Sequence, residues 1–354
     1  MDVSTQARIE AGGAGRAGAA APAGDAAEGA GMLDRLLALV EVDGRLEVRC
    51  ELGAGWDLAQ DAAEGHHMPF HVLLDGEALV DADGLSAAPM RAGDVLMLPG
   101  GGAHRLRDRD PASLTRPGEG ALLCGRFVVP AASARLVRAL VPPALVVRGE
   151  GPDSRLTRLL ALMREETDAP GEGGAALLRH LSGALFAVAL RAAMAAATEG
   201  RSVRDQASLD AGATPGAPSS ALETSAAGVL ALSAHPRLAA LAVALLREPA
   251  ADWTLDGMAE RAHLSRSSLI RAFQAAAGVS PAEFLTQIRM TEAGRRLRAG
   301  RDSVAAIGEA VGYASEAAFQ RAFKRETGLT PAAWRAAGEI VTPVALPERK
   351  RLAG

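Results

Sequence analysis

Histidines gather in one stretch of the chain, where they could bind a metal ion or line a ligand pocket. Four of the seven histidines lie there, at His66, His67, His71 and His104. Imidazoles carried by neighbouring strands are suitable ligands for Zn, Fe, Ni or Cu. Core packing, or a pocket for an organic ligand, is the simpler interpretation of the same residues. We therefore predict an effector pocket at His67, His71 and His104, with a metal ion there as an open alternative.

The two cysteines, Cys50 and Cys124, are a second candidate for chemistry. Two cysteines are too few for a disulfide framework or a cysteine zinc cluster. Both lie in predicted strands, so their thiols could come within disulfide distance, and nearby Arg49 and Arg126 could lower a thiol pKa. The alternative is that both thiols are small buried hydrophobic groups. A redox pair is therefore one of the predicted effector sites.

The segment that carries these residues is predicted to be an all-β unit over residues 32–130. Alternation puts Leu46, Val48 and Cys50 on one face of a strand, and the Asp75-Gly76 turn predicts a hairpin between the runs on either side of it. We expect a small barrel or sandwich. The predicted strands cover residues 45–52, 70–74, 77–81, 95–98 and 121–129.

A helical region is predicted over residues 131–200. Apolar residues recur at helical spacing between residues 156 and 163 and again between residues 175 and 198. The longer helix either packs on the β unit or serves dimerisation, and the two roles are compatible. The apolar run from 181 to 190 is about ten residues, whereas a membrane span needs about 20. We therefore expect no membrane segment and a cytoplasmic protein.

Three segments are predicted to lie outside the folded units. Residues 1–31 are rich in alanine and glycine and are predicted to be a disordered tail. Residues 201–234 are predicted to be a flexible linker. Residues 338–354 are predicted to be a C-terminal tail.

The last third of the chain contains an internal repeat with a period of 50 residues. Ser265 recurs as Ser315, and Gly278 recurs as Gly328. Each serine is a predicted helix N-cap, and each glycine a predicted left-handed helix end. A shorter helix precedes each unit, and a helix over 281–298 joins them. Two helices with a short turn form a helix-turn-helix, so residues 235–337 are predicted to hold two such units.

The polar side chains on the two repeated helices could contact phosphate oxygens and base edges. For a single helix, a polar face that is only solvated would be the simpler interpretation. Residues 235–337 carry a net charge of +4, whereas the first 234 residues carry −9. This asymmetry favours a polyanion as the partner of the C-terminal third. The predicted DNA-contacting residues are Ser265, Arg266, Ser267, Ser268, Arg271 and Gln274 in the first unit and Ser315, Glu316, Gln320, Arg321 and Lys324 in the second.

Residues 235–337 resemble the DNA-binding domain of the AraC/XylS family of bacterial transcription regulators. The residues that carry this resemblance are Gly-Val-Ser-Pro at 278–281, Arg289, Ala293, Leu297, Gly312-Tyr313, Phe319, Phe323 and Gly-Leu-Thr-Pro at 328–331. The resemblance implies recognition helices over 265–276 and 315–326 that enter successive major-groove segments, with promoter DNA and RNA polymerase as partners. Gly308 departs from the family, which usually has alanine there, and glycine costs about 1 kcal/mol of helix propensity.

The N-terminal unit resembles a cupin sensor domain. Gly93, Pro99, Gly101 and His104 have the spacing of the second cupin motif, whereas the histidines at 66–71 depart from the first motif. The closest resemblance is to the branch of AraC-type activators in which some members sense reactive chlorine or other oxidants through cysteine. The resemblance implies an oxidant, a small molecule or a metal as effector.

Together these observations predict an α+β protein: a cupin-like β-barrel with a helical appendage, then an all-α domain with two helix-turn-helix units. A metal-dependent cupin enzyme is the competing function. An enzyme has no use for two aligned helix-turn-helix units, and the first cupin motif is incomplete. We therefore predict a homodimeric, sequence-specific transcription regulator, an activator rather than an enzyme, with no required cofactor.

Overall fold

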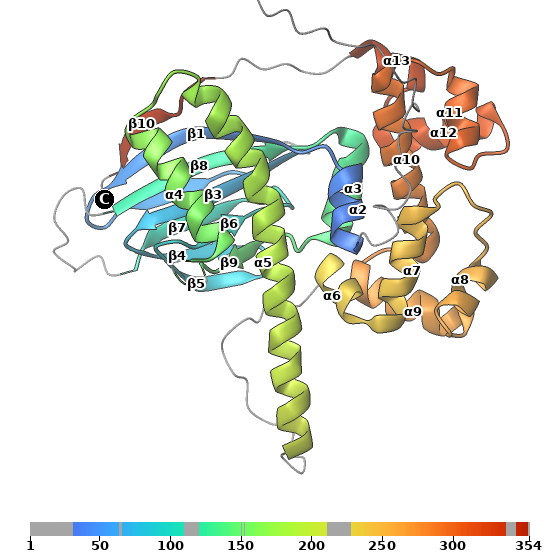
Figure 1. Ribbon diagram of the computed structural model, residues 1–354, viewed down its shortest axis with the longest axis horizontal. Helices are drawn as coiled ribbons and strands as arrows, with labels where there is room; N and C mark the ends of the chain where they lie inside the picture. Colours follow the sequence, from blue (N-terminus) through green and yellow to red (C-terminus); the bar gives the residue numbers. More distant parts are fainter. Residues whose placement is uncertain are drawn as a thin grey trace, which may run out of the picture.

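The computed structural model shows a strand-rich N-terminal domain beside a helical C-terminal domain, which confirms the α+β class (Figure 1). It describes residues 31–63, 66–109, 120–149, 151, 153–210, 228–337 and 345–352. For residues 197–210, 229, 230 and 236 it describes the backbone alone. The tail predicted over residues 1–31 therefore lies outside the described residues except at its last position.

The N-terminal strands form two sheets that enclose a common apolar core. The six-stranded sheet has the order β10-β1-β8-β3-β6-β9, and the four-stranded sheet has the order β2-β7-β4-β5. The strands are β1 Asp43–Leu52, β2 Asp57–Gln60, β3 His67–Asp75, β4 Glu77–Ala82, β5 Leu85–Arg91, β6 Val95–Met97, β7 His104–Asp108, β8 Gly120–Val128, β9 Leu145–Val147 and β10 Glu348–Leu352.

The predicted barrel is not closed in the described residues, and the domain is a sandwich of two sheets (Figure 1). The predicted hairpin around Asp75-Gly76 is also wrong. Gly76 has a φ of 92° and turns the chain out of the six-stranded sheet into the four-stranded one. As a result, β3 pairs with β6 and β8, whereas β4 pairs with β5 and β7. The two-residue hairpin loop is instead Asp83-Gly84, between β4 and β5.

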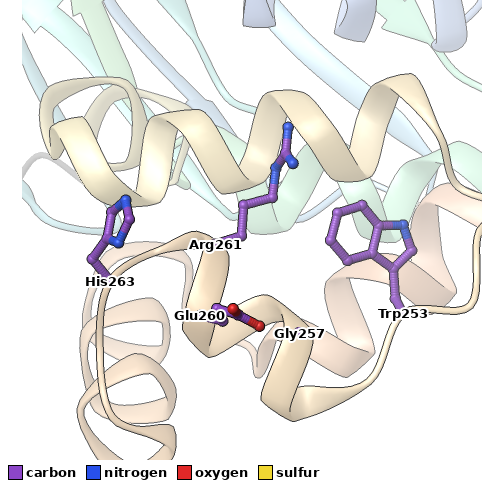
Figure 2. Close-up of a pocket in the computed structure, with 5 residues that line it drawn as sticks. All are labelled: Trp253, Gly257, Glu260, Arg261 and His263. Atoms are coloured by element: carbon purple, nitrogen blue, oxygen red, sulfur yellow. The ribbon is translucent and has the colours of Figure 1, made fainter.

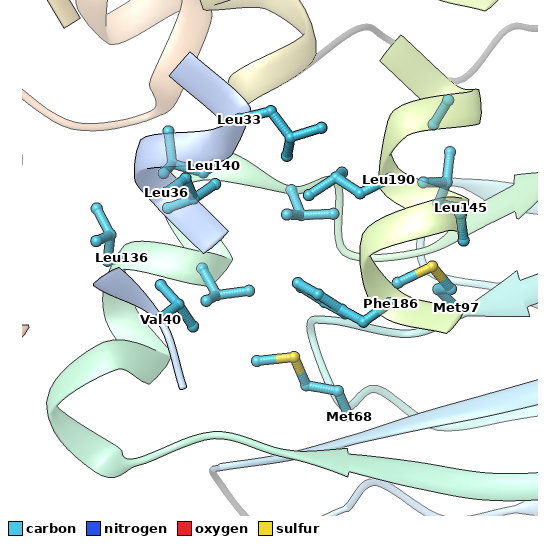
Figure 3. Packing of buried hydrophobic residues seen from close by; sticks show 14 of the residues in the cluster. Leu33, Leu36, Val40, Met68, Met97, Leu136, Leu140, Leu145, Phe186 and Leu190 are labelled. Atoms are coloured by element: carbon cyan, nitrogen blue, oxygen red, sulfur yellow. The ribbon is translucent and has the colours of Figure 1, made fainter. Parts of the chain in front are cut away.

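Four helices of the described residues flank the six-stranded sheet: the last two along the chain cover its outer face, and the first two lie between the sheets and the C-terminal domain (Figure 1). They are α2 Met32–Leu39, α3 Ala131–Leu140, α4 Arg155–Asp168 and α5 Gly174–Asp210. Figure 3 shows Leu36 of α2, Leu140 of α3 and Phe186 of α5 converging on Met68 and Met97 of the sheet. Burial of these apolar side chains stabilises the layer by roughly 25 cal/mol for each Å² removed from water. A domain with few aromatic residues thus builds its core from leucine, valine and methionine.

Helix α5 is longer than predicted and projects beyond the sandwich (Figure 1). The linker predicted over 201–234 is helical at both ends, because α5 continues to Asp210 and α6 covers Val229–Ala234, whereas residues 211–227 lie outside the described residues. The segment Gly174–Ala196 is long and apolar enough to cross a membrane, but core helices pass the same test, and this one packs on the sheet.

The C-terminal domain contains the two predicted helix-turn-helix units. Ser265 and Ser315 cap their helices through the backbone N–H groups of Ser268 and Ala318, at 3.2 and 3.3 Å. Gly278 and Gly328 end the same helices in the left-handed conformation. The helices are α7 Pro236–Arg247, α8 Leu255–Arg261, α9 Arg266–Ala277, α10 Pro281–Ala299, α11 Val304–Ala310, α12 Glu316–Thr327 and α13 Pro331–Ala337.

Helix α3 joins the two domains. Ala132 belongs to the apolar cluster of the second helix-turn-helix unit, and its carbonyl oxygen accepts a hydrogen bond of 3.1 Å from the Thr291 hydroxyl of α10. Arg135 of the same helix forms an ion pair of 2.7 Å with Glu326, near the end of α12. The N-terminal domain therefore contacts α10, which connects the two helix-turn-helix units, and the end of α12.

Candidate functional site

Cys50 and Cys124 lie on adjacent strands with their thiols in contact. Cys50 of β1 and Cys124 of β8 are diagonal neighbours, because the register pairs Cys50 with Leu122 and Val48 with Cys124. Both thiols are free, both are buried between the two sheets, and they share a hydrogen bond. The structure thus brings together the two predicted redox residues in an apolar surrounding.

Two of the three predicted pocket histidines extend this thiol pair into a hydrogen-bonded chain. His71 Nδ1 lies 3.1 Å from Cys124 Sγ, and His71 Nε2 lies 2.8 Å from His104 Nε2. His67 is not part of the chain: its ring contacts His66, and its Nδ1 lies 3.4 Å from the Arg126 guanidinium. The histidines and cysteines that the sequence presented as alternative sites therefore form one site.

A single carbonyl group fixes the tautomers along this chain. His104 Nδ1 lies 3.1 Å from the Gly102 carbonyl oxygen, which can only accept, so His104 carries its proton on Nδ1. The Nε2 atom of neutral His104 must then accept a proton from His71 Nε2–H. Neutral His71 in turn has an unprotonated Nδ1, which accepts a hydrogen bond from the Cys124 S–H group.

Burial keeps both imidazoles neutral. His71 is 1% exposed, and desolvation, with a smaller contribution from His104, lowers its pKa to about 3. Desolvation also lowers the pKa of His104, although the hydrogen bond to Gly102 opposes this change. Both side chains are therefore hydrogen-bond donors and acceptors without charge at neutral pH.

The two thiols have different acidities. The interaction with the Cys124 side chain lowers the pKa of Cys50, burial opposes this change, and the charge of Lys350 adds to it. The same interaction, seen from Cys124, raises the pKa of Cys124, and burial raises it further. Cys50 is therefore the thiol that more readily becomes a thiolate, the nucleophilic form of cysteine.

The arginines expected to act on the thiols have other partners. The Arg49 guanidinium forms an ion pair of 2.6 Å with Asp168 of α4, and that of Arg126 forms one of 2.6 Å with Glu47. The cation that acts on Cys50 is Lys350 of β10, which sequence reasoning missed. Nothing in the local pattern of residues 348–352 predicts a strand paired with β1.

A three-ligand metal centre does not fit the described side chains. Within the described ranges, no group of three or more His, Cys, Asp or Glu residues is arranged to hold a metal ion. His71 and His104 present two facing nitrogens, and Cys124 lies at the opposite nitrogen of His71. The pair alone offers an incomplete coordination sphere.

Two hollows on the described surface lie outside the sandwich interior. One, of about 450 Å³, lies beside α8 and is lined by Trp253, Gly257, Glu260, Arg261 and His263 (Figure 2). The other, of about 430 Å³, lies between α3 and the end of α9. Neither contains a predicted effector residue.

The predicted DNA-contacting side chains of the first unit lie mostly on the exposed face of α9. Arg266, Ser267, Arg271 and Gln274 are exposed, and Ser265 is the N-cap. Arg266 forms a bidentate ion pair with Asp256 of α8. The Gln274 amide donates to the Gly278 carbonyl at 2.6 Å, so that side chain caps the end of the helix.

The second unit presents a similar exposed face on α12. Glu316, Gln320, Arg321 and Lys324 are exposed, and the Gln320 amide donates to Glu316 at 2.7 Å. Neither Arg271 nor its counterpart Arg321 forms an ion pair with Glu260 or Glu309 in the described residues. Both arginines therefore have guanidinium groups available at the surface.

Comparison with known proteins agrees with this division of the chain. Residues 32–195 match the cupin domain family, and residues 258–337 match a helix-turn-helix domain family. The chain is 28% identical to the RCS-specific HTH-type transcriptional activator RclR of Escherichia coli over 306 residues, which cover 86% of this chain and 96% of RclR. It is 25% identical to the HTH-type transcriptional regulator MtrA of Neisseria gonorrhoeae over 87% of this chain and 98% of MtrA.

The C-terminal third has a more similar counterpart. An AraC-like transcription regulator of Streptomyces lividans is 43% identical over 108 residues, which cover 30% of this chain and 36% of that protein. The fold, the paired helix-turn-helix units and these relatives define a DNA-binding transcription regulator with a separate N-terminal domain. More particularly, the chain combines a cupin domain with an AraC-like helix-turn-helix domain, and the relatives named here are transcription regulators rather than enzymes.

Proposed function

We propose that this regulator is a transcription activator whose cupin domain senses an oxidant of the hypochlorous acid class through Cys50 and Cys124. The observation that carries the proposal is the contact between two buried thiols of different acidity on adjacent strands. The name of RclR, an RCS-specific activator similar over most of this chain, supports the same effector class and the same sign of regulation.

The chemistry consumes one molecule of oxidant for each thiol pair. The Cys50 thiolate attacks the chlorine of hypochlorous acid, which forms a sulfenyl chloride and releases hydroxide. The Cys124 sulfur then attacks the Cys50 sulfur, a disulfide forms, and chloride and the Cys124 proton leave. The two sulfurs together lose two electrons, and the chlorine gains them. His71 Nδ1 already accepts the hydrogen bond of the Cys124 thiol that must lose this proton.

A reporter fused to a promoter that the wild-type chain activates tests the proposal. We expect hypochlorite to change reporter output in wild type but not in Cys50→Ser or Cys124→Ser. Met97→Leu, which removes a sulfur elsewhere in the same sheet, is the matched control and should respond like wild type. Equal responses of all four proteins would overturn the redox proposal.

A small organic effector and a metal ion are the alternatives. The interior between the sheets is filled by the apolar cluster around Cys50, which favours the thiol chemistry over an organic ligand. The metal ion at His71 and His104 stays a prediction. Calorimetric titration of wild type and of His104→Gln with Zn²⁺ checks this prediction. If the site binds a metal ion, wild type should show heat of binding and retain the metal, and the variant should show neither.

For DNA, we propose that the exposed faces of α9 and α12 read successive major-groove segments. Arg266 with Ser267 is assigned to base edges, and so are Glu316 and Gln320 in the second unit. Lys324 is assigned to the phosphate backbone. When DNA binds, Asp256 must then either release the Arg266 guanidinium or hold it in the orientation that contacts the base edge. Exposure of these residues and the caps that orient both helices support the assignment.

Binding titrations at several salt concentrations, on operator and on scrambled DNA, separate the two roles. We expect Arg266→Ala to cost about 1–3 kcal/mol on the operator alone, and Lys324→Ala to weaken both DNAs and reduce the salt slope by about one. Arg155→Ala, an exposed arginine of α4 in the sensor domain, is the control and should change neither. If Arg266→Ala weakened both DNAs equally, α9 would not read bases through this residue.

Assembly and cellular context complete the proposal. We propose a cytoplasmic homodimer that acts with RNA polymerase at promoters. Leu162 of α4 and Leu177 of α5 are 52% and 46% exposed, on two helices that pack together, and they support α4 and α5 as the dimer surface.

A further inference from the structure

The C-terminal strand β10 pairs with the edge of the sensor sheet beside Cys50. It follows the DNA-binding domain in sequence and lies outside both matched families. Its pairing with β1 is parallel, with Cys50 opposite Lys350 and Leu52 opposite Leu352. Figure 1 shows β10 at the edge of the six-stranded sheet, next to β1.

Two sets of contacts hold this strand in register. On one face Leu352 packs against the apolar cluster that contains Cys50, and its carbonyl oxygen accepts a hydrogen bond of 2.7 Å from the Gly53 N–H. On the other face the Arg349 guanidinium donates to the Thr167 and Asp168 carbonyl oxygens at the end of α4, at 2.8 and 3.2 Å. Side chains alternate along a strand, so Lys350 lies on the same face as Leu352 and Cys50.

Few charged groups act on Cys50 from that face. The Cys124 side chain of β8 lies on the neighbouring strand and lowers the pKa of Cys50, and Lys350 of β10 is the cation that also lowers it. Glu47 of β1 acts on Cys124, and Glu348 of β10 lies 3.4 Å from Lys350 Nζ. Arg49 and Glu51 flank Cys50 in sequence, so they point to the opposite face of β1. The cation that acts on the reactive sulfur, and that lies opposite it in the sheet register, therefore comes from a segment that follows the DNA-binding domain.

We propose that β10 is part of the Cys50 site and that Lys350 is a positioning residue, whose charge keeps the Cys50 sulfur in its reactive form towards hypochlorous acid. This inference rests on the proposed oxidant sensing. In the reaction above, Lys350 acts before the first step, when the Cys50 thiolate attacks chlorine. It stabilises the thiolate and takes part in no bond that forms or breaks.

The pH profile of Cys50 alkylation in the full chain tests the role of Lys350. Iodoacetamide labels thiolates, and mass spectrometry of peptides separates Cys50 from Cys124. We expect Lys350→Ala to move the midpoint of the Cys50 profile to higher pH by about half a unit, which is about a threefold loss of labelling rate near neutral pH. Lys350→Arg should restore the wild-type midpoint, because it restores the charge.

Two control variants separate charge from structure. Arg351→Ala removes a neighbouring cation whose side chain points to the other face, so it should leave the midpoint unchanged. Leu352→Asp should detach β10, expose Cys50 and raise its labelling rate at every pH. An unchanged midpoint in Lys350→Ala, or an equal shift in Arg351→Ala, would overturn the proposal.

The same proteins distinguish failure of this inference from failure of oxidant sensing. If Lys350→Ala shifts the midpoint but hypochlorite leaves the reporter unchanged in wild type, the positioning role stands and the oxidant proposal falls. If hypochlorite acts through Cys50 but Lys350→Ala matches wild type in both assays, the oxidant proposal stands and Lys350 has no part in it.

Discussion

At the scale of single residues, His71 connects the chemistry of the site to the stability of the fold. Its ring is enclosed between Cys124 and His104, and its pKa is lowered to about 3, whereas an unfolded histidine titrates near 6.5. The unfolded chain therefore binds more protons than the folded chain between these two pH values, and stability falls as the pH falls through this window.

We predict that lowering the pH from 7.5 to 5 removes about 2 kcal/mol from the free energy of unfolding through His71 alone. Denaturant unfolding of wild type and of His71→Gln at both pH values measures this loss, which the variant should lack. His180→Gln, an exposed histidine of α5, is the control and should keep the wild-type pH dependence. The same pH dependence in wild type and His71→Gln would contradict the burial argument.

At the scale of elements, Gly308 shows how packing can outweigh helix propensity. Propensity alone predicts that alanine at this position of α11 gains about 1 kcal/mol. In the structure a Cβ atom at Gly308 would lie 3.0 Å from Cβ and Cγ of Phe319, which is fully buried in α12. Glycine therefore permits the close approach of the two helices in the second unit.

We predict that Gly308→Ala destabilises the DNA-binding domain by about 1 kcal/mol, because overpacking costs about 1–3 kcal/mol and exceeds the gain in propensity. Thermal unfolding of the full chain measures the effect. Gly257→Ala in α8 is the matched control, since a Cβ atom there meets only Thr254 Oγ1 at 3.4 Å and should stabilise the chain. A stabilising Gly308→Ala would show that Phe319 can move aside.

At the scale of the whole molecule, exposed leucines on α4 and α5 predict how two copies associate. We predict that the full chain sediments as a dimer at tens of micromolar, and that Leu162→Glu combined with Leu177→Glu produces a monomer, because both leucines are about half exposed on packed helices. Leu329→Glu, which changes an exposed leucine of the DNA-binding domain, is the control and should stay dimeric. A monomeric wild type would rule this surface out as the dimer interface.

The features that the sequence determined by itself are those with local causes. The N-caps at Ser265 and Ser315 and the left-handed glycines at 278 and 328 lie where the repeat predicts them, because a cap needs only its own turn of helix. The family resemblances have the same origin, since they rest on motifs of a few adjacent residues. Five of the ten strands in the described residues were predicted, and their bounds agree with the structure to within three residues.

Tertiary structure decided the features that depend on which distant segments meet. Asp75-Gly76 and Asp83-Gly84 are equivalent turn signals, yet only the second joins paired strands, because the partner of a strand is chosen by the whole sheet. The contact between Cys124 and His71, and the arrival of Lys350 beside Cys50, required the register of β1, β3, β8 and β10. No spacing along the chain encodes these contacts, since strand pairing brings together residues separated by tens to hundreds of positions.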